Sequence, residues 1–282
     1  MLTINDVTCL SSRLACIVGL LVFSIVGCGD VGSDGGGGAA GTGATGGTGA
    51  TGGVGGASGT GGMPPVTLFL SAAEGRGNSG PPLQDVEFCE TDTVNCATSD
   101  ANGRATLEVE VPADGRISYT YAKDGYMSGL RADVVDKELD EVLGNFNISD
   151  ETMTDIAAVL MTPYPLQGTG WVSISAFVTG ARPGFVGVVG ATFELVNAAG
   201  RVYYDDPTGA PSLDPTETGM SGEGGFVEVT PGEVEVRLGG TATNCVVWKG
   251  WPGSEANTVR MPVKAGFVTW GSVSCEMREG SL

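Results

Sequence analysis

The stretch Asp100-Ala-Asn-Gly-Arg-Ala-Thr-Leu-Glu-Val-Glu-Val111 contains the two patterns that decide the fold class. From Arg104 to Val111, polar and apolar residues alternate strictly, which is typical of a β-strand with one buried face. Asn102-Gly103, directly before this run, predicts a tight turn because both residues tolerate a positive φ. The stretch therefore predicts a mainly β protein in which short strands follow turns.

Outward from this stretch, similar segments fill the chain in two blocks. In the first block we predict further strands at 66–71, 85–91, 116–121 and 142–148. In the second we predict strands at 171–178, 191–197, 201–204, 226–229, 233–238, 244–248, 258–263 and 267–276. Each block has enough strands for a β-sandwich, so we expect one sandwich domain at 66–148 and a second at 167–278.

The segment between the blocks has helical periodicity. Ser149 is a favourable N-cap, acidic residues follow it, and the apolar residues fall on one stripe. This stripe comprises Met153, Ile156, Ala157 and Leu160. We expect it to pack against a sheet, and the docking of a partner is the alternative. Residues 149–166 are therefore predicted to form a short helix and a linker.

Parts of the first block resemble a known family. They are Leu83-Gln-Asp-Val-Glu-Phe-Cys89, Ser99-Asp-Ala-Asn-Gly-Arg-Ala-Thr-Leu-Glu-Val109 and Lys123-Asp-Gly-Tyr126. Together they resemble the carboxypeptidase regulatory-like domain, a transthyretin-like β-sandwich. In the second block, Gly190-Ala-Thr-Phe-Glu-Leu-Val196 and Gly222-Glu-Gly-Gly-Phe226 repeat the plan loosely. The resemblance implies two tandem Ig-like or transthyretin-like sandwiches and an accessory, non-catalytic role; with the helix predicted above, the expected fold is two sandwiches and one short connecting helix.

Composition excludes several kinds of function. The chain contains no histidine, which rules out Ser-His-Asp and Cys-His catalysis and every zinc site that needs histidine. The absence of histidine also rules out the activities of hydroxyisourate hydrolases and intradiol dioxygenases, which occur on transthyretin-like sandwiches and need histidines. A net charge of −19 argues against nucleic acid as a partner. We expect no enzyme; the remaining enzymatic alternative is a glycoside hydrolase that uses two carboxylates.

The N-terminus predicts export and a lipid anchor. The apolar run from Ala15 to Gly27 is shorter than the ~20 residues of a membrane-spanning helix and fits a signal peptide at 1–27. It ends in Ile25-Val-Gly-Cys28, which resembles the lipobox of bacterial lipoproteins. The resemblance implies cleavage before Cys28 and lipidation of its thiol, and Gly29 favours sorting to the outer membrane. An ordinary secretory signal with an incidental cysteine is the alternative.

Residues 28–65 follow as the lipidated cysteine and a glycine-rich linker. The linker repeats Thr-Gly-Ala-Thr-Gly-Gly at Thr42 and Thr48 and has no residues able to build a core, so we expect it to be disordered. It is predicted to hold the sandwiches away from the membrane.

Cysteine parity agrees with export. Of seven cysteines, the signal peptide removes Cys9 and Cys16 and the lipid occupies Cys28. The four that remain are Cys89, Cys96, Cys245 and Cys275, and an even number in an exported protein predicts two disulfides. Three pairings are possible. We expect Cys89 and Cys96 to join across a short turn, and Cys245 and Cys275 to tie the second block to its last strand and shield an open sheet edge.

Two sets of residues are candidate ligand sites. The first is an acidic loop with Asp205, Asp206, Asp214 and Glu217, which offers the carboxylates that calcium needs. A solvated loop without a metal is the alternative, and no other cofactor is predicted. The second is Trp248 with Trp251, where an exposed indole would stack on a sugar; packing within the sandwich is the alternative.

These observations predict a membrane-anchored lipoprotein of the cell envelope with a binding or structural role. Its partner is expected to be a polysaccharide or an envelope protein. The rival hypothesis is a soluble secreted binding protein with the same two domains.

Overall fold

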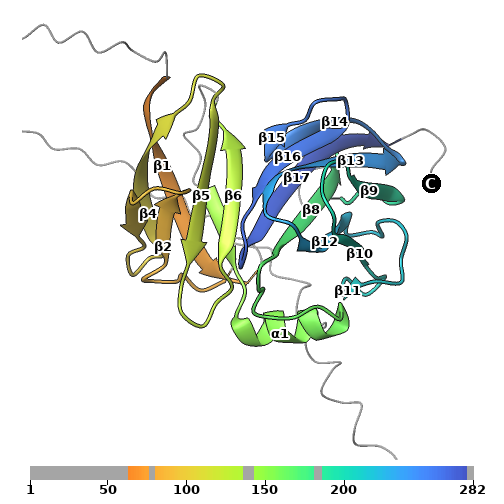
Figure 1. The fold of residues 1–282 in the computed structure, drawn as a ribbon, viewed down its shortest axis with the longest axis horizontal. Coiled ribbons are helices and arrows are strands. Elements are labelled where there is room, and N and C mark those ends of the chain that lie inside the picture. The colour runs from red at the N-terminus through yellow and green to blue at the C-terminus, as the bar shows by residue number, and fades with distance from the viewer. Residues whose placement is uncertain (1–62, 76–79, 136–142, 181–185, 278–282) are drawn as a thin grey trace, which may run out of the picture. The chain divides into compact units, whose positions relative to one another are not determined.

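The computed structural model describes residues 63–75, 80–135, 143–180 and 186–277. The predicted signal peptide, Cys28 and nearly all of the linker at 28–65 lie outside these ranges. The described residues belong to one compact unit, Gly59–Leu282. They form three β-sheets and one helix (Figure 1), which confirms the predicted mainly β, sandwich-like fold class.

The first sheet, here called the β1 sheet, contains three strands in the order β4-β1-β7. β1 (Met63–Glu74) pairs antiparallel with β4 (Arg104–Val111) and parallel with β7 (Leu143–Asn147). β4 shows the predicted alternation over its whole length, with every second residue buried and the residues between exposed. This confirms the strand from which the fold class was inferred.

The second sheet, here called the shared sheet, runs through both blocks in the order β11-β10-β12-β8-β17-β6-β5-β2-β3, with β14 paired to β17 beside this path. From the first block it takes β2 (Glu87–Glu90), β3 (Cys96–Thr98), β5 (Arg116–Ala122) and β6 (Gly129–Val134). From the second block it takes β8 (Gly170–Val178), β10 (Arg201–Asp205), β11 (Pro211–Ser212), β12 (Glu223–Val229), β14 (Ala242–Lys249) and β17 (Val268–Met277).

The third sheet, here called the β13 sheet, has the order β15-β16-β13-β9. Its strands are β9 (Ala191–Leu195), β13 (Gly232–Gly240), β15 (Trp251–Pro252) and β16 (Thr258–Val263). Figure 1 shows the β1 sheet and the β13 sheet on opposite sides of the strands β5, β6, β17 and β8.

The two hydrophobic cores lie on opposite faces of the shared sheet. Tyr119 of the first core pairs with Arg131, and Arg131 pairs with Trp270, so all three side chains point to one face. Val172 of the second core pairs with Thr269, the neighbour of Trp270, and therefore points to the other face. The parallel pairing of β17 with β6 thus joins two sandwiches into one sheet. The domain division at 149–166 stays a prediction, since this sheet crosses it.

β6 is the strand at this junction, and the sequence does not predict it. Five of its six residues are buried, so the polar-apolar alternation of a half-exposed strand is absent. Arg131 and Asp133 on this strand form an ion pair of 2.6 Å, which allows two charges inside a buried strand. Burial on both faces therefore removes the pattern on which the sequence prediction relied.

β17 corrects the expectation that the last strand forms an open sheet edge. It pairs with β8 on one side and with β6 and then β14 on the other. Cys275 is fully buried in this interior strand, and its disulfide to Cys245 lies within the sheet between β14 and β17. The bridge therefore stabilises the attachment of β14 and does not shield β17.

The helix α1 (Asp150–Val159) packs against the shared sheet as expected. The Ser149 side chain accepts a hydrogen bond from the Thr152 amide, which confirms the predicted N-cap. Met153, Ala157 and Leu160 are buried in a third cluster that includes Trp171 and Val268. Among the described residues no helix is long and apolar enough to cross a membrane.

Candidate functional site

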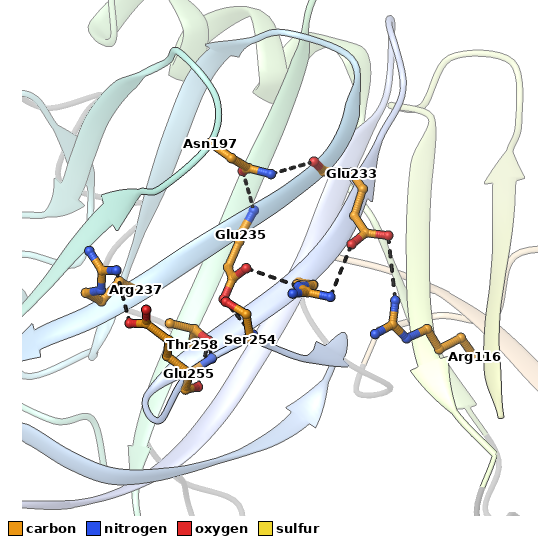
Figure 2. Close-up of polar contacts among 9 residues, drawn as sticks. Arg116, Asn197, Glu233, Glu235, Arg237, Ser254, Glu255 and Thr258 are labelled. Carbon is orange, nitrogen blue, oxygen red and sulfur yellow. Dashed lines mark hydrogen bonds and ion pairs between the residues drawn. The ribbon is translucent and has the colours of Figure 1, made fainter. Parts of the chain in front are cut away.

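Charged side chains gather on the outer face of the β13 sheet. Along β13, Val234 and Val236 point into the second core, so Glu233, Glu235 and Arg237 point away from it. Figure 2 shows these side chains with partners from β16 and the turn before it, together with Asn197, which follows β9, and Arg116 of β5. We call this set the outer polar network.

Glu235 is the most buried carboxylate of the outer polar network, with 6% of its surface exposed. One carboxylate oxygen accepts hydrogen bonds from the Ser254 amide and hydroxyl at 2.7 and 2.6 Å. The other accepts from Arg260 Nε at 3.1 Å. Burial opposes ionisation, but hydrogen bonds from Ser254, Thr258 and Arg260 outweigh it and lower the pKa of Glu235 to about 2. Glu235 is therefore ionised at neutral pH.

The remaining members of the network fix the backbone around Glu235. The Asn197 side chain accepts a hydrogen bond from the Glu235 amide and donates one to the Glu233 carbonyl (Figure 2). Arg237 pairs with Glu194 at 3.1 Å and with Glu255 at 3.2 Å. Since each of these groups is already satisfied by a neighbour, the arrangement fits a structural role better than proton transfer.

Arg116 extends the network from the second block to the first. It lies on β5, and its guanidinium is 3.7 Å from Glu233, which also pairs with Arg260 at 3.7 Å (Figure 2). The guanidinium carbon also lies 5.4 Å from the centre of the Trp251 ring. Trp251 Nε1 in turn donates a hydrogen bond of 3.1 Å to the Ile117 carbonyl.

Two further contacts join the blocks. The Gly250 amide donates to the Ala132 carbonyl at 2.8 Å, and Lys264 pairs with Asp92 at 3.1 Å. With Arg116, Trp251 and the pairing of β6 to β17, they form a continuous junction of backbone and side-chain bonds. These bonds hold the two sandwiches together as a fixed pair.

A buried charge cluster lies on the face of the shared sheet to which Tyr119, Arg131 and Trp270 point. Arg131 donates to Asp133 and to the Gly144 carbonyl on β7, so the pair also ties β6 to the β1 sheet. Desolvation raises the pKa of Asp133, although Arg131 counteracts it. Lys249 on β14 faces this pair. Burial and, second, the charge of Arg131 lower the pKa of Lys249 to about 8.

Apolar side chains are exposed on this same face, at the ends of β8, β14 and β17. Val246 is 68% exposed and Trp248 is 51% exposed. Phe177 on β8 meets the Trp248 ring edge to face, with ring centres 5.8 Å apart and planes at 79°. Ser274 on β17 pairs laterally with both Val246 and Phe177. We call Phe177, Val246, Trp248 and Ser274 the Trp248 face.

The predicted pair of tryptophans is separated by the structure. Trp251 is half-buried in the junction, as the packing alternative expects, whereas Trp248 is exposed on a sheet face. Phe177 and Arg116 are the residues that sequence analysis missed. Phe177 sits at an outward position of β8, but only the sheet register places it beside Trp248.

The disulfides are those expected among the possible pairings. Cys89 on β2 pairs with Cys96 on β3 across the predicted turn, and Cys245 pairs with Cys275. Val86 and Phe88 point into the first core, so the Cys89–Cys96 bridge lies at the surface. Cys28 lies outside the described residues, so its lipidation stays a prediction.

The four acidic residues of the predicted calcium loop lie in different environments. Among the described residues, no three of its four carboxylates come within 4.8 Å of one another. Asp205 is buried, Asp206 accepts hydrogen bonds from Thr208 and Ala210 within its own turn, and Asp214 and Glu217 are exposed. Calcium binding here stays a prediction that titration of chelator-treated protein would test.

Two hollows accompany these surfaces. A cavity of about 20 Å³ lies beneath α1, between Trp171, Tyr203 and Asp205, which is room for about one water molecule. An open cleft of about 540 Å³ lies near the start of α1 and is lined by Asp85, Glu87, Lys123, Asp124, Tyr126 and Asp150, among others. Among the described residues, no three carboxylates of this cleft gather within ligand distance of a metal.

Comparisons with known proteins give alignments of low identity and low TM-score. No family model matches the chain, and no curated protein matches its sequence. The TIE protein of Bacillus anthracis aligns with 76% of this chain and 34% of its own at 13% identity and a TM-score of 0.25, so the chain spans about a third of that protein.

Two pilins align over a similar share of the chain. The minor pilin GBS52 of Streptococcus agalactiae covers 76% of this chain and 98% of its own, with 13% identity and a TM-score of 0.26. The shaft pilin SpaA of Lactobacillus rhamnosus GG covers 76% of this chain and 100% of its own, with 11% identity and a TM-score of 0.22. At these values the likeness carries no conclusion about function, and the family resemblance of the first block is not confirmed.

Proposed function

We propose that this protein is a lipid-anchored module of the bacterial cell envelope that holds a non-catalytic binding surface at a distance from the membrane. In this proposal Cys28 takes the lipid, the glycine-rich segment 28–65 is the tether, and the two sandwiches are the presented body. The observation that carries the proposal is the junction, where β17 pairs with β6 and makes one sheet of both sandwiches.

The junction supports a presenting role because it fixes one sandwich against the other. Two domains joined only by a linker would move independently, and a contact made by one would not be oriented by the other. Here backbone hydrogen bonds, the Trp251–Ile117 bond and the Arg116–Glu233 pair all cross between the blocks. A surface on the second sandwich is thereby held in a defined direction relative to the tether.

The position of the first strand also supports a tethered role. β1 begins at Met63, within the last residues of the predicted linker, and is the middle strand of its sheet. Its residues Met63–Ser71 pair with β4, and Leu70–Glu74 pair with β7. The strand that continues the tether is thus bonded to one neighbour near its start and to the other near its end.

The two disulfides agree with the proposed compartment. Disulfides persist in exported proteins, whereas cytosolic thiols are kept reduced. The outer polar network and the junction use their charged groups in ion pairs, so the proposal assigns no reaction to them.

The anchor is tested by mass spectrometry of the mature protein and by detergent phase partitioning. We expect the mature chain to begin at Cys28, to carry fatty-acyl mass there and to enter the detergent phase. Cys28→Ser should abolish the acyl mass and leave an uncleaved precursor when the lipoprotein peptidase is the only processing enzyme. Cys16→Ser is the matched control, because it changes a cysteine in the same segment and should leave processing intact.

The rival hypothesis is a soluble secreted protein, and the same measurement separates the two. A mature chain without acyl mass, or one that starts at another residue, would refute the anchor. Fractionation of the envelope then tests the expected outer-membrane location.

A further inference from the structure

We propose that the Trp248 face binds a neutral polysaccharide by stacking sugar rings on the indole of Trp248. This inference rests on the proposed function, since it names the class of ligand that the proposed envelope module would bind. It is carried by the position, exposure and surroundings of Phe177, Val246, Trp248 and Ser274.

The exposure of this face is unusual for its position in the fold. Trp171 and Val268 lie on the same face of β8 and β17, and there the cluster under α1 buries them completely or nearly so. Toward the other ends of these strands, Val246 and Trp248 of the neighbouring strand β14 are more than half exposed. Trp248, Val246 and Phe177 lie next to one another, and a contiguous group of exposed apolar side chains is the feature that marks an interaction site.

Trp248 is held in place without being buried. Its ring meets Phe177 at 79°, and Lys249 Nζ lies 6.0 Å from the ring centre. A tryptophan fixed by its neighbours loses little conformational entropy when it contacts a ligand. The apolar faces of pyranose rings, which carry axial C–H groups, match such a flat aromatic surface.

Hydrogen-bonding groups border the apolar centre. The Thr179 and Ser274 hydroxyls lie 3.0 Å apart, and Asn244 at the start of β14 donates to Glu276 on β17 at 2.7 Å. Hydroxyl and amide groups donate to and accept from sugar hydroxyls, and a carboxylate accepts from them. The face thus offers stacking in its middle and polar contacts at its border, as a sugar chain requires.

Charge selects a neutral polymer. The chain has a net charge of −19, so polyanions such as uronic-acid polymers and nucleic acids are repelled. Glu276 beside this face adds to that repulsion, and Lys249, 6.0 Å from the centre of the Trp248 ring, opposes it in part. A neutral glycan has no charge to be repelled and keeps its stacking contact.

The shape of β14 argues against a protein strand as the occupant. β14 pairs with β17, and its register is interrupted between Thr243 and Val246 and again between Val247 and Lys249. Such irregular edges disfavour the addition of another strand. A ligand that binds to the side chains on the sheet face does not need to pair with the edge of β14.

The test is isothermal calorimetry on the full mature chain in detergent, with cellohexaose, laminarihexaose, maltohexaose and xylohexaose as neutral probes and tetragalacturonate as the anionic probe. We expect at least one neutral probe to bind, with little dependence on salt, and tetragalacturonate not to bind. Trp248→Ala should weaken the neutral probe by roughly tenfold or more through the lost stacking contact, and Trp248→Tyr should retain part of the affinity.

Phe69→Ala is the matched control, because Phe69 is another aromatic residue of a sheet face and is 46% exposed. It should leave binding unchanged, and melting curves of all variants verify that they fold. The inference is overturned if no neutral probe binds, if tetragalacturonate binds as well as they do, or if Trp248→Ala and Phe69→Ala behave alike. Such a failure would not contradict the lipid anchor or the junction, because the acyl mass tests the anchor and unfolding measurements test the junction.

Discussion

Trp251 and Ile117 are 134 residues apart in the chain, yet the indole N–H of Trp251 donates a 3.1 Å hydrogen bond to the Ile117 carbonyl. Trp251 belongs to the β13 sheet and Ile117 to the first block, so this bond crosses between the two sandwiches. It lies beside the Arg116 guanidinium, which contacts both the Trp251 ring and Glu233. Trp251, which the sequence suggests as a ligand-binding residue, is therefore part of the junction between the sandwiches.

Trp251→Phe should therefore destabilise the protein. The ring volume is largely retained, but the Ile117 carbonyl loses its donor, which typically costs about 1 kcal/mol. Trp251→Ala should cost more, because packing and the contact with Arg116 are also lost. Urea unfolding followed by circular dichroism measures both. Val94→Ala, at a position 99% exposed, is the control and should change stability little. Equal stability of Trp251→Phe and the native chain would contradict a role for this bond.

Glu235 should make stability depend on pH in the acid range. Although burial opposes ionisation, its hydrogen bonds lower the pKa of Glu235 to about 2 in the folded chain from the ordinary 4.5 of a glutamate, so the folded state binds fewer protons than the unfolded state. The contribution is fully present above about pH 5 and is lost as the pH falls through 4.5 toward 2.

Denaturant unfolding at several pH values between about 2 and 6 tests this dependence. Glu235→Gln should be less stable at neutral pH, because Arg260 loses its charged partner, and should show a flatter acid profile. Glu110→Gln, at an exposed position of β4, should keep the native profile. If Glu235→Gln shows the same dependence of stability on pH as the native chain, another group causes that dependence.

The two disulfides should contribute unequally to stability. Cys245 and Cys275 are 30 residues apart, whereas Cys89 and Cys96 are 7 apart. By the loop-closure argument the longer loop contributes about 3.5 kcal/mol and the shorter about 2.5 kcal/mol. The double variant Cys245→Ala, Cys275→Ala should also leave a cavity, since Cys275 is fully buried.

Thermal unfolding of the two double variants compares the bridges directly. We expect a lower melting temperature without Cys245–Cys275 than without Cys89–Cys96. The reverse order would show that the surface hairpin, and not the link between β14 and β17, limits stability.

The two sandwiches should unfold in one transition. β17 of the second block and β6 of the first pair within the same sheet, so loss of either sandwich exposes part of the other. Calorimetry of the mature chain should give a van't Hoff enthalpy close to the calorimetric enthalpy. Two separate peaks would mean that the junction contributes little, and a Trp251→Ala chain provides the comparison with a weakened junction.

Much of the fold is predictable from local pattern. β4 and β16 coincide with the predicted segments, and the Ser149 cap places the start of α1, because these elements have one exposed and one buried side. β6 escapes prediction because its residues are covered on both faces. The disulfide partners follow from parity and spacing, whereas calcium binding by the acidic loop stays a prediction, because composition does not say whether four carboxylates close in sequence gather around an ion.

The sequence by itself determined the strands with alternating residues, the helix between the blocks, the exclusion of histidine chemistry and the even set of cysteines. These depend on short-range order and on composition, and both can be read along the chain. Tertiary structure alone decided that one sheet joins the sandwiches, that Trp251 is bound in the junction while Trp248 is exposed beside Phe177, and that the last strand is interior. Those outcomes depend on the register between strands far apart in sequence, because a shift of one residue would turn each side chain to the opposite face.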